Sequence, residues 1–551
     1  MFFTRKRFFV PPTISYNGIS IPIKTSHKFL GLVLDSPTLT WKHHLEKVKR
    51  SCASRLNLLK VLGNSKWGCS RRALTKFYTA CIRSVIDYGY PIYGSISPSN
   101  YSKLQVIQSS AIRIILGAWK NSPIADMHCE LAMPMLSVHH KDVLLSHLWK
   151  LQDSPFSNPV FNKISSMYAQ GVSMYAFLTY KHKVPFIKRS QDIARTLGLE
   201  CSVFSPQEVV SPMAPWLKTS GRISLDILDQ IGNMQSAQVR LTSFLLTLAV
   251  NYPNYMFLYT DGSKSAMEGI VTVGSAIYIP DLPLTLKWKL NPNHSVIASE
   301  LFAILQALRW IIAHVTPHSN SVICSDSLSS LQLIQQSSPG SYKGLVHKIH
   351  ESMMSAENSG KVIKLQWTPA HCGVMGNEKA DEAAKNTANL PETPLLLDKA
   401  ERRSLHRAAL HSDAVRSWNF IAPHSRLGAI KDKFEKWPWA ERNSRREETL
   451  LSNFRLGNPP LNRYLHQSRI SPIQYCYACP GIVEDSEHFF FNCRLYRMQR
   501  IILFRSLQGI NIRNPTLKIL LGGGGFSPHK NKEILDLTIA YCRNTRRFKY
   551  L

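Results

Sequence analysis

The chain has 551 residues, more than one ordinary hydrophobic core holds, so we expect three or more folded units. Hydrophobic residues make up 44% and charged residues 19%, which excludes a disordered polar tail as a description of the whole chain. The formal net charge of +31 favours nucleic acid over an anionic membrane surface as a partner, because neutralising phosphates releases counterions.

The sequence gives no sign of a secreted or membrane-spanning protein. The longest apolar run that we identify, Phe244 to Tyr259, is interrupted by Asn251, Pro253 and Asn254, so we expect no membrane partner. The first residues, MFFTRKRFFVPP, lack the long apolar core of a signal peptide. The eleven cysteines are mostly scattered singly, which suits a reducing compartment. We therefore expect an intracellular protein.

Two patterns occupy the first part of the chain. Residues 1–35 alternate short apolar runs with turns, as strands do. Residues 36–155 are helical in pattern, with an apolar stripe at Leu45, Val48, Cys52, Leu56 and Leu59. Between Lys42 and Arg72 the only acidic residue is Glu46, so the polar helix face either follows phosphates or is simply solvated.

Residues 156–250 contain Ser/Pro-rich patches typical of linkers around short helices. Strands and helices then alternate over residues 255–390. The five strand-like runs are YMFLYTD, IVTVGSAIYIP, LTLKWKL, SVICSDS and KVIKLQW. An apolar helix, SVIASELFAILQALRWIIAHV, lies between the third and fourth runs.

Four carboxylates occur where these elements begin or end. An apolar strand ends at Asp261 beside a Gly-Ser turn, Glu300 lies in the first turns of the apolar helix, Asp326 ends another strand, and Asp381 lies on a helix. Clustered carboxylates are costly unless cations neutralise them, and hard oxygen ligands suit Mg2+ or Mn2+. Two such ions about 4 Å apart can hold an attacking water and a leaving oxygen, which points to phosphodiester hydrolysis.

Each of these residues also has a structural interpretation. Asp261 can form the turn, Glu300 can be a surface residue, Asp326 can cap a helix, and Asp381 can pair with a lysine. His371 lies in the loop TPAHCGVMGN, where an imidazole can transfer a proton or act as a structural hydrogen bonder.

The C-terminal part combines a helical stretch, 391–470, with a Cys/His cluster in 471–500 and a basic tail, 501–551, in which Gly522–Gly525 predict a flexible joint. Cys476, Cys479, His488 and Cys493 have the spacing C-x2-C-x8-H-x4-C, which suits a structural Zn2+. A redox pair or buried free thiols are the alternatives. The neighbouring aromatic residues can stack on bases or form a small core; they are Tyr477, Phe489, Phe490 and Phe491.

The blocks TDGSK, ASELFAILQAL, ICSDSLSSLQLI and WTPAHCGVMGNEKADEAAK resemble the ribonuclease H family in order and spacing. The resemblance implies an α/β fold with a mixed five-stranded sheet and flanking helices, acting on RNA–DNA hybrids. Carried over, it makes Asp261, Glu300, Asp326 and Asp381 the ligands of two ions. It also gives His371 a role in leaving-group departure or product release. Asn377 and Ser263 are candidates, by position alone, for sensing the 2′-hydroxyl.

The flanking regions resemble the C-terminal portion of a jockey-like non-LTR retrotransposon reverse transcriptase polyprotein. Residues 1–35 then correspond to palm-edge strands, 36–155 to a thumb-like region, and 471–500 to a zinc-knuckle-like segment. The sequence has no Asp-Asp pair, so we expect no DNA synthesis from this chain alone. The resemblance implies no small-molecule cofactor, and charge and family favour a nuclear location.

Two alternatives to an active hybrid ribonuclease follow from these observations. The first is a catalytically weak nucleic-acid-binding relic, favoured by the missing palm. The second is an integrase-like nuclease of the same broader fold, against which the DGS and HCGVMGNEKAD blocks argue.

Overall fold

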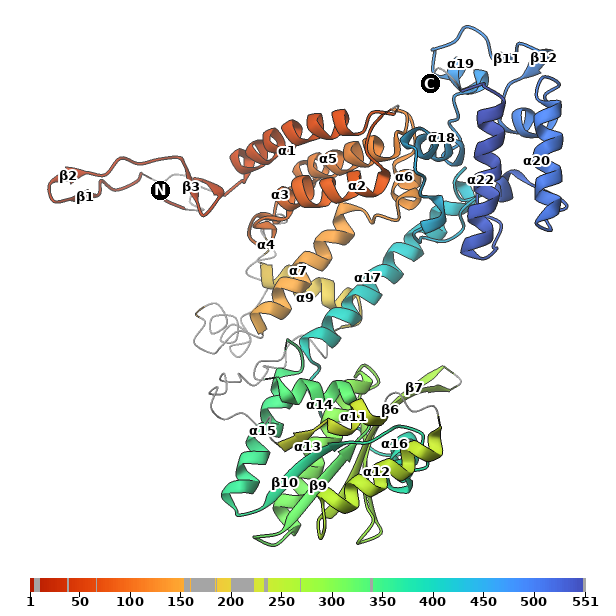
Figure 1. Ribbon diagram of the computed structural model, residues 1–551. Helices are drawn as coiled ribbons and strands as arrows, with labels where there is room; N and C mark the ends of the chain where they lie inside the picture. Colours follow the sequence, from red (N-terminus) through yellow and green to blue (C-terminus); the bar gives the residue numbers. More distant parts are fainter. Residues whose placement is uncertain are drawn as a thin grey trace. The chain divides into compact units, whose positions relative to one another are not determined.

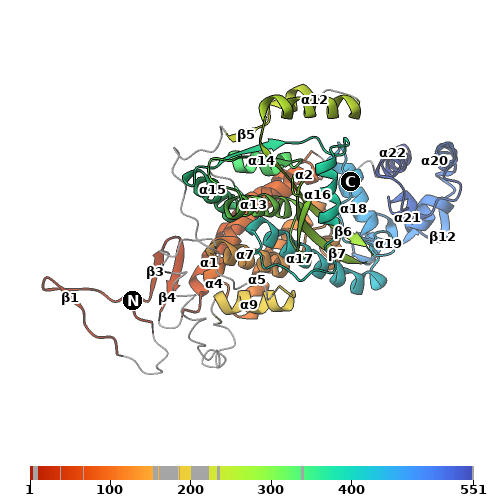
Figure 2. The same cartoon turned by 90° about the horizontal axis from the view of Figure 1, so that it is seen from below.

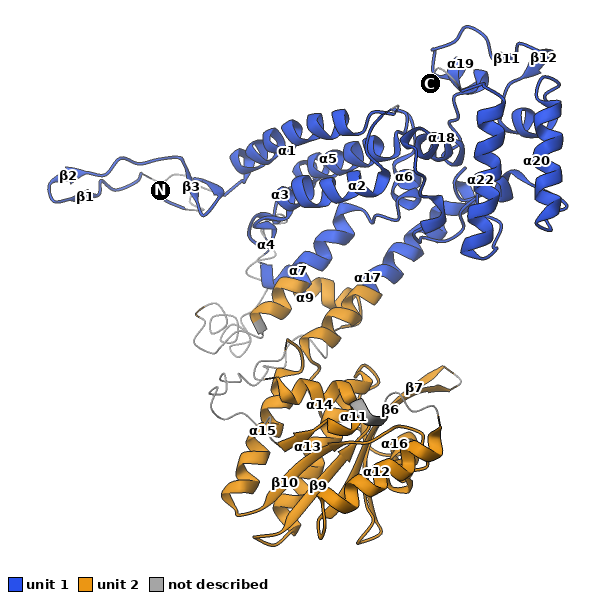
Figure 3. Ribbon diagram, in the orientation of Figure 1, with its two compact units in different colours: residues 1–145, 174–190, 409–551 blue, residues 146–173, 191–408 orange. Residues whose placement is uncertain are grey.

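The computed structural model describes residues 1–3, 10–36, 39–65, 67–152, 159, 184, 186–199, 222–231, 236–267, 269–336 and 340–548. The chain divides into two compact units (Figure 3). Unit 1 comprises residues 1–145, 174–190 and 409–551, and unit 2 comprises residues 146–173 and 191–408. Most of the predicted linker region, 160–183 and 200–221, lies outside the described residues.

A six-stranded mixed sheet is the centre of unit 2, in the order β5-β10-β9-β6-β7-β8. Figure 1 labels β6, β7, β9 and β10 of this sheet. Its strands are β5 (Ile223–Ser224), β6 (Met256–Met267), β7 (Ile270–Ile279), β8 (Leu284–Leu290), β9 (Asn320–Ser325) and β10 (Val362–Trp367). β6, β9, β10 and β5 are parallel, while β7 and β8 are antiparallel. The prediction of five strands is wrong by one, because β5 has only two residues and pairs through Leu365↔Ile223, too short for periodicity to reveal.

Helices cover both faces of this sheet because strand side chains alternate between faces. Leu258 and Ile323 face one core with α13 (Val296–His314), α14 (Leu328–Gln335) and α15 (Lys343–Asn358). Tyr259 and Val322 face the other, with α11 (Asp226–Ile231), α12 (Ala237–Asn251) and α16 (Met375–Lys385). α13 and α15 lie side by side (Figures 1 and 2).

Helix α13 is the most apolar helix among the described residues, and by length and composition it could cross a membrane. It is the apolar helix expected between the third and fourth strand-like runs, and Glu300 and Arg309 lie within it. However, 67% of that stretch is buried inside the unit, as in the core helix of a folded domain. Ser295 forms its N-cap, because the Ser295 hydroxyl accepts a hydrogen bond from the Ala298 N–H at 3.1 Å.

Strand β6 does not end at Asp261, contrary to the prediction. It continues to Met267 and pairs with β7 throughout, from Tyr259↔Tyr278 to Met267↔Ile270. The Gly-Ser pair after Asp261 is part of the strand and forms no turn, because a long β7 supplies ladder partners for it.

The first part of unit 1 has the predicted order of strands followed by helices. The strands are β1 (Ser15–Tyr16), β2 (Ile19–Ser20), β3 (Ser26–Phe29) and β4 (Leu32–Asp35). The helices are α1 (Lys42–Leu62), α2 (Arg71–Phe77), α3 (Ser84–Asp87), α4 (Tyr90–Tyr93), α5 (Pro98–Leu116), α6 (Ile124–Glu130) and α7 (Leu136–Gln152). A π-helical turn, Tyr78–Arg83, joins α2 to α3.

The C-terminal part of unit 1 packs on those helices. It contains α18 (Arg445–Arg455), α19 (Asn462–Gln467), β11 (Tyr475–Cys476), β12 (Cys479–Val483), α20 (Arg497–Gly509), α21 (Leu517–Leu520) and α22 (Pro528–Asn544). The Arg445 guanidinium donates to the carbonyl oxygens of Ile115 and Ile114, at 2.6 and 2.7 Å, at the C-terminus of α5. These bonds supply donors to carbonyl oxygens in the last turn of the helix, where intrahelical donors run out.

Three helices cross the division between the units by residue number: α7, α9 (Phe186–Thr196) and α17 (Lys399–Ile421). In unit 2, the Trp149 indole of α7 donates to the His406 ring of α17 at 2.8 Å. In unit 1, Lys141 of α7 pairs with Asp413 of α17 at 2.9 Å.

Candidate functional site

Two neighbouring parallel strands deliver two of the predicted acids to one edge of the sheet. β6 and β9 pair in parallel, with Thr260 opposite Ser325. The next residues are Asp261, still within β6, and Asp326, the first residue after β9, so the two acids lie at adjacent positions on neighbouring strands.

The third acid reaches the same edge from α13. A Cβ atom at Gly262 would lie 2.4 Å from the Glu300 backbone nitrogen and 2.6 Å from the Ser299 hydroxyl, so only glycine permits β6 to pass this close to the helix. The Gly262 N–H also hydrogen-bonds the Glu300 carboxylate. The DG pair of the sequence is thus explained by close contact between strand and helix, and not by a turn.

Asp261, Glu300 and Asp326 form a compact acidic group. Each offers a carboxylate oxygen within 4.8 Å of the others, and Asp261 and Glu300 are buried. Among the described residues, Asp261 Oδ2 and Glu300 Oε2 are buried without a hydrogen-bond partner. Buried carboxylate oxygens that lack a donor are costly, so this group fits a bound cation.

Burial and mutual repulsion change the titration of the acidic group. Burial, followed by the charges of Asp326 and Asp381, raises the pKa of Asp261 to about 7. Burial and the neighbouring Asp261 raise the pKa of Glu300 well above its usual value, and burial raises the pKa of Asp326 as well. All three shifts favour the protonated acids, so a cation that binds here competes with protons.

Asp381 lies on α16, outside the group of three but near enough for its charge to raise the pKa of Asp261. It is half-buried, and the Lys385 ammonium one turn along the helix donates to it at 2.7 Å. The lysine pairing considered from the sequence is therefore present together with proximity to the other acids.

Asn377 is a site residue whose role the sequence did not reveal. Its side-chain amide donates to Asp326 Oδ2 at 3.0 Å, and Asn377 is itself buried. The hydrogen bond orients the Asp326 carboxylate, and a role of Asn377 in sensing the 2′-hydroxyl stays a prediction. In the sequence, the only indication of this role is that Asn377 lies four residues before Asp381 and therefore on the same helical face.

His371 lies in the loop between β10 and α16. It is exposed and has a left-handed backbone, φ 50°, followed by Gly373 at φ 86°. Its charge lowers the pKa of Asp326, which places the imidazole close to the acidic group. An exposed histidine beside a carboxylate cluster is accessible to a substrate.

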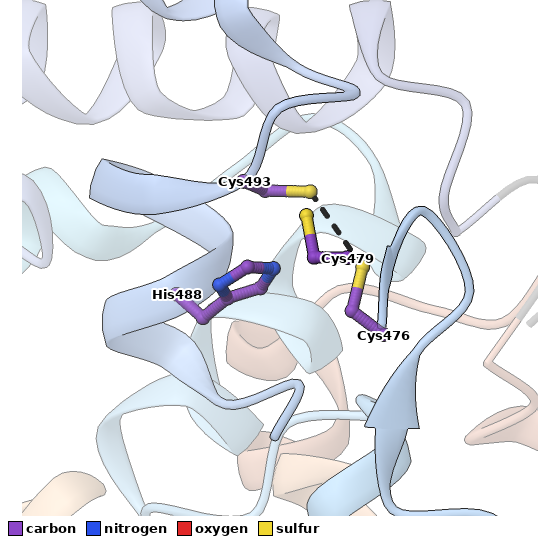
Figure 4. A group of neighbouring side chains, drawn as sticks. All are labelled: Cys476, Cys479, His488 and Cys493. Carbon is purple, nitrogen blue, oxygen red and sulfur yellow. Dashed lines mark hydrogen bonds between the residues drawn. The ribbon is translucent and has the colours of Figure 1, made fainter. Parts of the chain in front are cut away.

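The predicted Cys/His quartet comes together in unit 1. Cys476, Cys479, His488 and Cys493 are all buried, and their ligand atoms lie within 4.8 Å of one another. Figure 4 shows the three thiols and the imidazole pointing toward a common centre, with Cys476 Sγ and Cys493 Sγ 3.7 Å apart. His488 Nε2 is buried and, among the described residues, lacks a hydrogen-bond partner. Three sulfurs and one imidazole nitrogen suit tetrahedral zinc.

The aromatic residues near this quartet differ in how far they are buried. Phe489 and Phe490 are fully buried in the core of the C-terminal part, and Phe491 packs against it. Tyr477, between the first two cysteines, is 75% exposed. The core interpretation is confirmed for Phe489 and Phe490.

Comparison with known proteins agrees with the geometry of unit 2. Residues 253–389 match the RNase H family. The chain is 34% identical over 106 residues to the probable RNA-directed DNA polymerase from transposon BS of Drosophila melanogaster. It is 24% identical over 146 residues to the RNA-directed DNA polymerase from mobile element jockey of Drosophila funebris. These stretches cover 19% and 26% of this chain, but only 12% and 16% of the relatives.

Unit 2 therefore contains a ribonuclease H domain at residues 253–389. The chain is related to the reverse transcriptase polyproteins of jockey-like non-LTR retrotransposons, with a ribonuclease H domain.

Proposed function

We propose that unit 2 hydrolyses the RNA strand of RNA–DNA hybrids with two divalent metal ions. The observation that carries the proposal is the convergence of Asp261, Glu300 and Asp326 from three elements, with two buried oxygens that lack a hydrogen-bond donor. Such a group is electrostatically unfavourable unless it binds cations.

The proposed roles follow from what each side chain contacts. Asp261, Glu300, Asp326 and Asp381 hold the ions, for which Mg2+ or Mn2+ is the chemical fit to oxygen ligands. When bound, such ions would supply an activated water and would neutralise charge on the leaving oxygen. Asn377 keeps one oxygen of Asp326 occupied, so the other faces the cluster. The exposed His371 assists leaving-group departure or product release.

A cleavage assay on the full chain tests this proposal. Labelled RNA–DNA hybrid, RNA duplex and DNA duplex are incubated with Mg2+ and with chelator. We expect cleavage of the RNA strand of the hybrid alone, lost on chelation and in Asp326→Asn. Asp281→Asn, at an exposed position between β7 and β8, is the matched control and keeps activity. Equal cleavage of the DNA duplex would overturn hybrid specificity.

The alternative is a nucleic-acid-binding relic with little turnover. It predicts binding of the hybrid without metal-dependent cleavage, and Asp326→Asn then changes nothing in the assay. Measuring hybrid affinity beside cleavage separates the two functions.

We also propose that Cys476, Cys479, His488 and Cys493 bind one structural zinc ion. The burial of all four ligands argues for a closed, structural site with no open position for substrate. The CPGIV strand and the π-helical turn His488–Asn492 supply ligands from opposite sides, so the ion stabilises the link between them.

Native mass spectrometry tests the zinc site. We expect one zinc ion per chain in the parent and none in Cys476→Ser. The control is Cys69→Ser, which removes an exposed cysteine distant in sequence from the quartet and should keep the ion. A parent chain that purifies without zinc and does not take it up would contradict this proposal.

A further inference from the structure

The chain beyond residue 389, where the RNase H match ends, continues to pack on that domain. The Thr393 N–H donates to the Lys289 carbonyl oxygen at 2.7 Å, extending the edge of β8. His294 Nε2 lies 3.2 Å from the Leu395 carbonyl oxygen. The first turn of α17 then contacts the loop 291–295, which precedes helix α13.

Glu401, in the first turn of α17, is the centre of this contact. Glu401 is 5% exposed, and both of its carboxylate oxygens have hydrogen-bond partners. Oε1 accepts a hydrogen bond from the Ser295 N–H at 2.7 Å. Oε2 accepts one from the Asp398 N–H at 2.9 Å and lies 3.1 Å from His294 Nδ1. Burial favours the neutral acid, but the His294 ring and the two backbone N–H groups together hold the pKa of Glu401 below its usual value. A buried, ionised carboxylate with three donors is a strong geometric constraint.

The constraint acts on the start of α13. Ser295 is the N-cap of that helix, and its hydroxyl also lies 2.7 Å from the Tyr342 hydroxyl. Glu300 follows five residues later, about 7.5 Å along the helix axis. A shift of the cap therefore moves the Glu300 carboxylate with it.

The same loop is tied to the other side of the site. The Lys264 ammonium donates to the carbonyl oxygens of Pro292 and His294, at 3.0 and 2.7 Å. Lys264 follows Asp261 by three residues in β6. Loop 291–295 is thus held between the strand that carries Asp261 and the α17 residue Glu401, beside the acidic group.

We propose that Glu401 is a positioning residue of the nuclease: by holding the N-cap of α13, it fixes Glu300 in the metal-binding group. This inference rests on the proposed function, and it extends the functional nuclease to residues about 390–408, outside the matched domain. Glu401 touches neither metal nor substrate, so its effect is on metal affinity and not on the reacting atoms.

The test compares Glu401→Gln and Glu401→Ala with the parent full chain. Hybrid cleavage is measured against Mg2+ concentration, and Mn2+ binding is measured by calorimetry without substrate. We expect the metal concentration for half-maximal cleavage to rise about tenfold in Glu401→Ala, with a matching loss of Mn2+ affinity and little change in rate at saturating metal. Glu351→Gln, an exposed glutamate of α15, is the matched control.

The outcomes separate the two proposals. Unchanged metal affinity in both variants, or a lower maximal rate and unfolding temperature without an affinity change, overturns the positioning role. If the parent binds Mn2+ but does not cleave the hybrid, the proposed function is wrong. The Mn2+ affinities of the parent and the variants then still show whether Glu401 positions the metal-binding group. If both Glu401 variants fail to fold, Glu401→Asp makes the same test, because it keeps the charge but draws the carboxylate back from the Ser295 N–H by one methylene group.

Discussion

Two buried acids of unit 2, Asp261 and Glu300, are held where an apolar core would otherwise be expected. Leu258 and Leu301, three residues or fewer from them, are completely buried. Placing carboxylates beside such residues raises their pKa and lowers the stability of the metal-free fold. Function therefore opposes stability at these positions, and removing the charge should expose that conflict.

Asp261→Asn should stabilise the metal-free chain at neutral and alkaline pH. The pKa of Asp261 is about 7 when folded against 3.8 in the unfolded chain, so the folded state binds the extra proton. Stability is therefore lost as pH rises from about 4 to about 7, and the asparagine variant avoids this loss. Thermal unfolding in chelator should show a higher unfolding temperature for the variant at about pH 8, and a smaller gain near pH 5. A variant less stable than the parent at both pH values contradicts the assignment.

Asn377→Ala should raise the Mg2+ requirement of cleavage by about tenfold, because Asp326 loses the amide that orients it. Titrating Mg2+ in the cleavage assay measures the change. Asn386→Ala, at the exposed end of the same helix, should leave the titration curve in place. An equal shift in both variants would indicate a general effect on α16.

At the scale of elements, glycine determines how closely β7 approaches α16. A Cβ atom at Gly274 would lie 2.0 Å from the Ala384 carbonyl oxygen and 2.4 Å from the Thr387 hydroxyl. Neither neighbour is the movable end of a long side chain, so the helix itself has to shift. Asp381 lies on that helix, so the packing of the element and the position of a site residue are linked.

Gly274→Ala should destabilise unit 2 by about 1–3 kcal/mol through overpacking and weaken cleavage as α16 moves. Gly344→Ala is the opposite control, because nothing lies within 4 Å of its added methyl and it is in α15. That variant should be neutral or slightly stabilising, by roughly 0.5–1 kcal/mol. Urea unfolding of both variants measures the difference, and comparable losses would mean that strand–helix contact is not the cause.

At the scale of the whole molecule, unit 1 is built from segments far apart in the sequence. Glu130 of α6 is buried, with Arg455 of α18 at 3.0 Å and Arg71 of α2 at 3.2 Å. Burial raises the pKa of Glu130, but the two guanidinium groups and Lys431 outweigh burial and hold that pKa below its usual value. The carboxylate is thus ionised inside a core that joins residues 1–145 to residues 409–551.

Glu130→Ala should destabilise unit 1 by about 3–5 kcal/mol, because it leaves buried guanidinium groups without a counter-charge. Unit 2 has its own core, so its unfolding transition should stay in place and should still respond to Mg2+. Denaturation followed by circular dichroism, with and without Mg2+, distinguishes the unfolding of unit 2, which Mg2+ shifts, from that of unit 1. Glu46→Gln, in an exposed pair with Lys49, should change stability by less than about 1 kcal/mol. A parallel loss in both units would show that they unfold as one.

Several features were predictable from local patterns. The four cysteine and histidine ligands follow from spacing, and the convergence of Asp261 and Asp326 follows from two apolar runs that each lead into an acid. Others were not. The continuation of β6 past Asp261 depends on pairing with β7. The tight packing at Gly523, where a Cβ would lie 2.0 Å from the Ile430 carbonyl oxygen, depends on a residue 93 positions earlier in the chain. Gly522–Gly525 were expected to form a joint because glycine allows both freedom and close contact.

The sequence by itself determined the chemistry of this protein: which carboxylates and which thiols are available, and on which kinds of element they lie. Such information is local, because periodicity, caps and ligand spacing extend over a few residues. Only the tertiary structure decided that Asn377 orients Asp326, that Glu401 holds the start of α13, and that α18 belongs with α5 and α6. Those relations join residues 51, 106 and 325 positions apart, and burial of polar groups at such distances leaves no periodic trace in the chain.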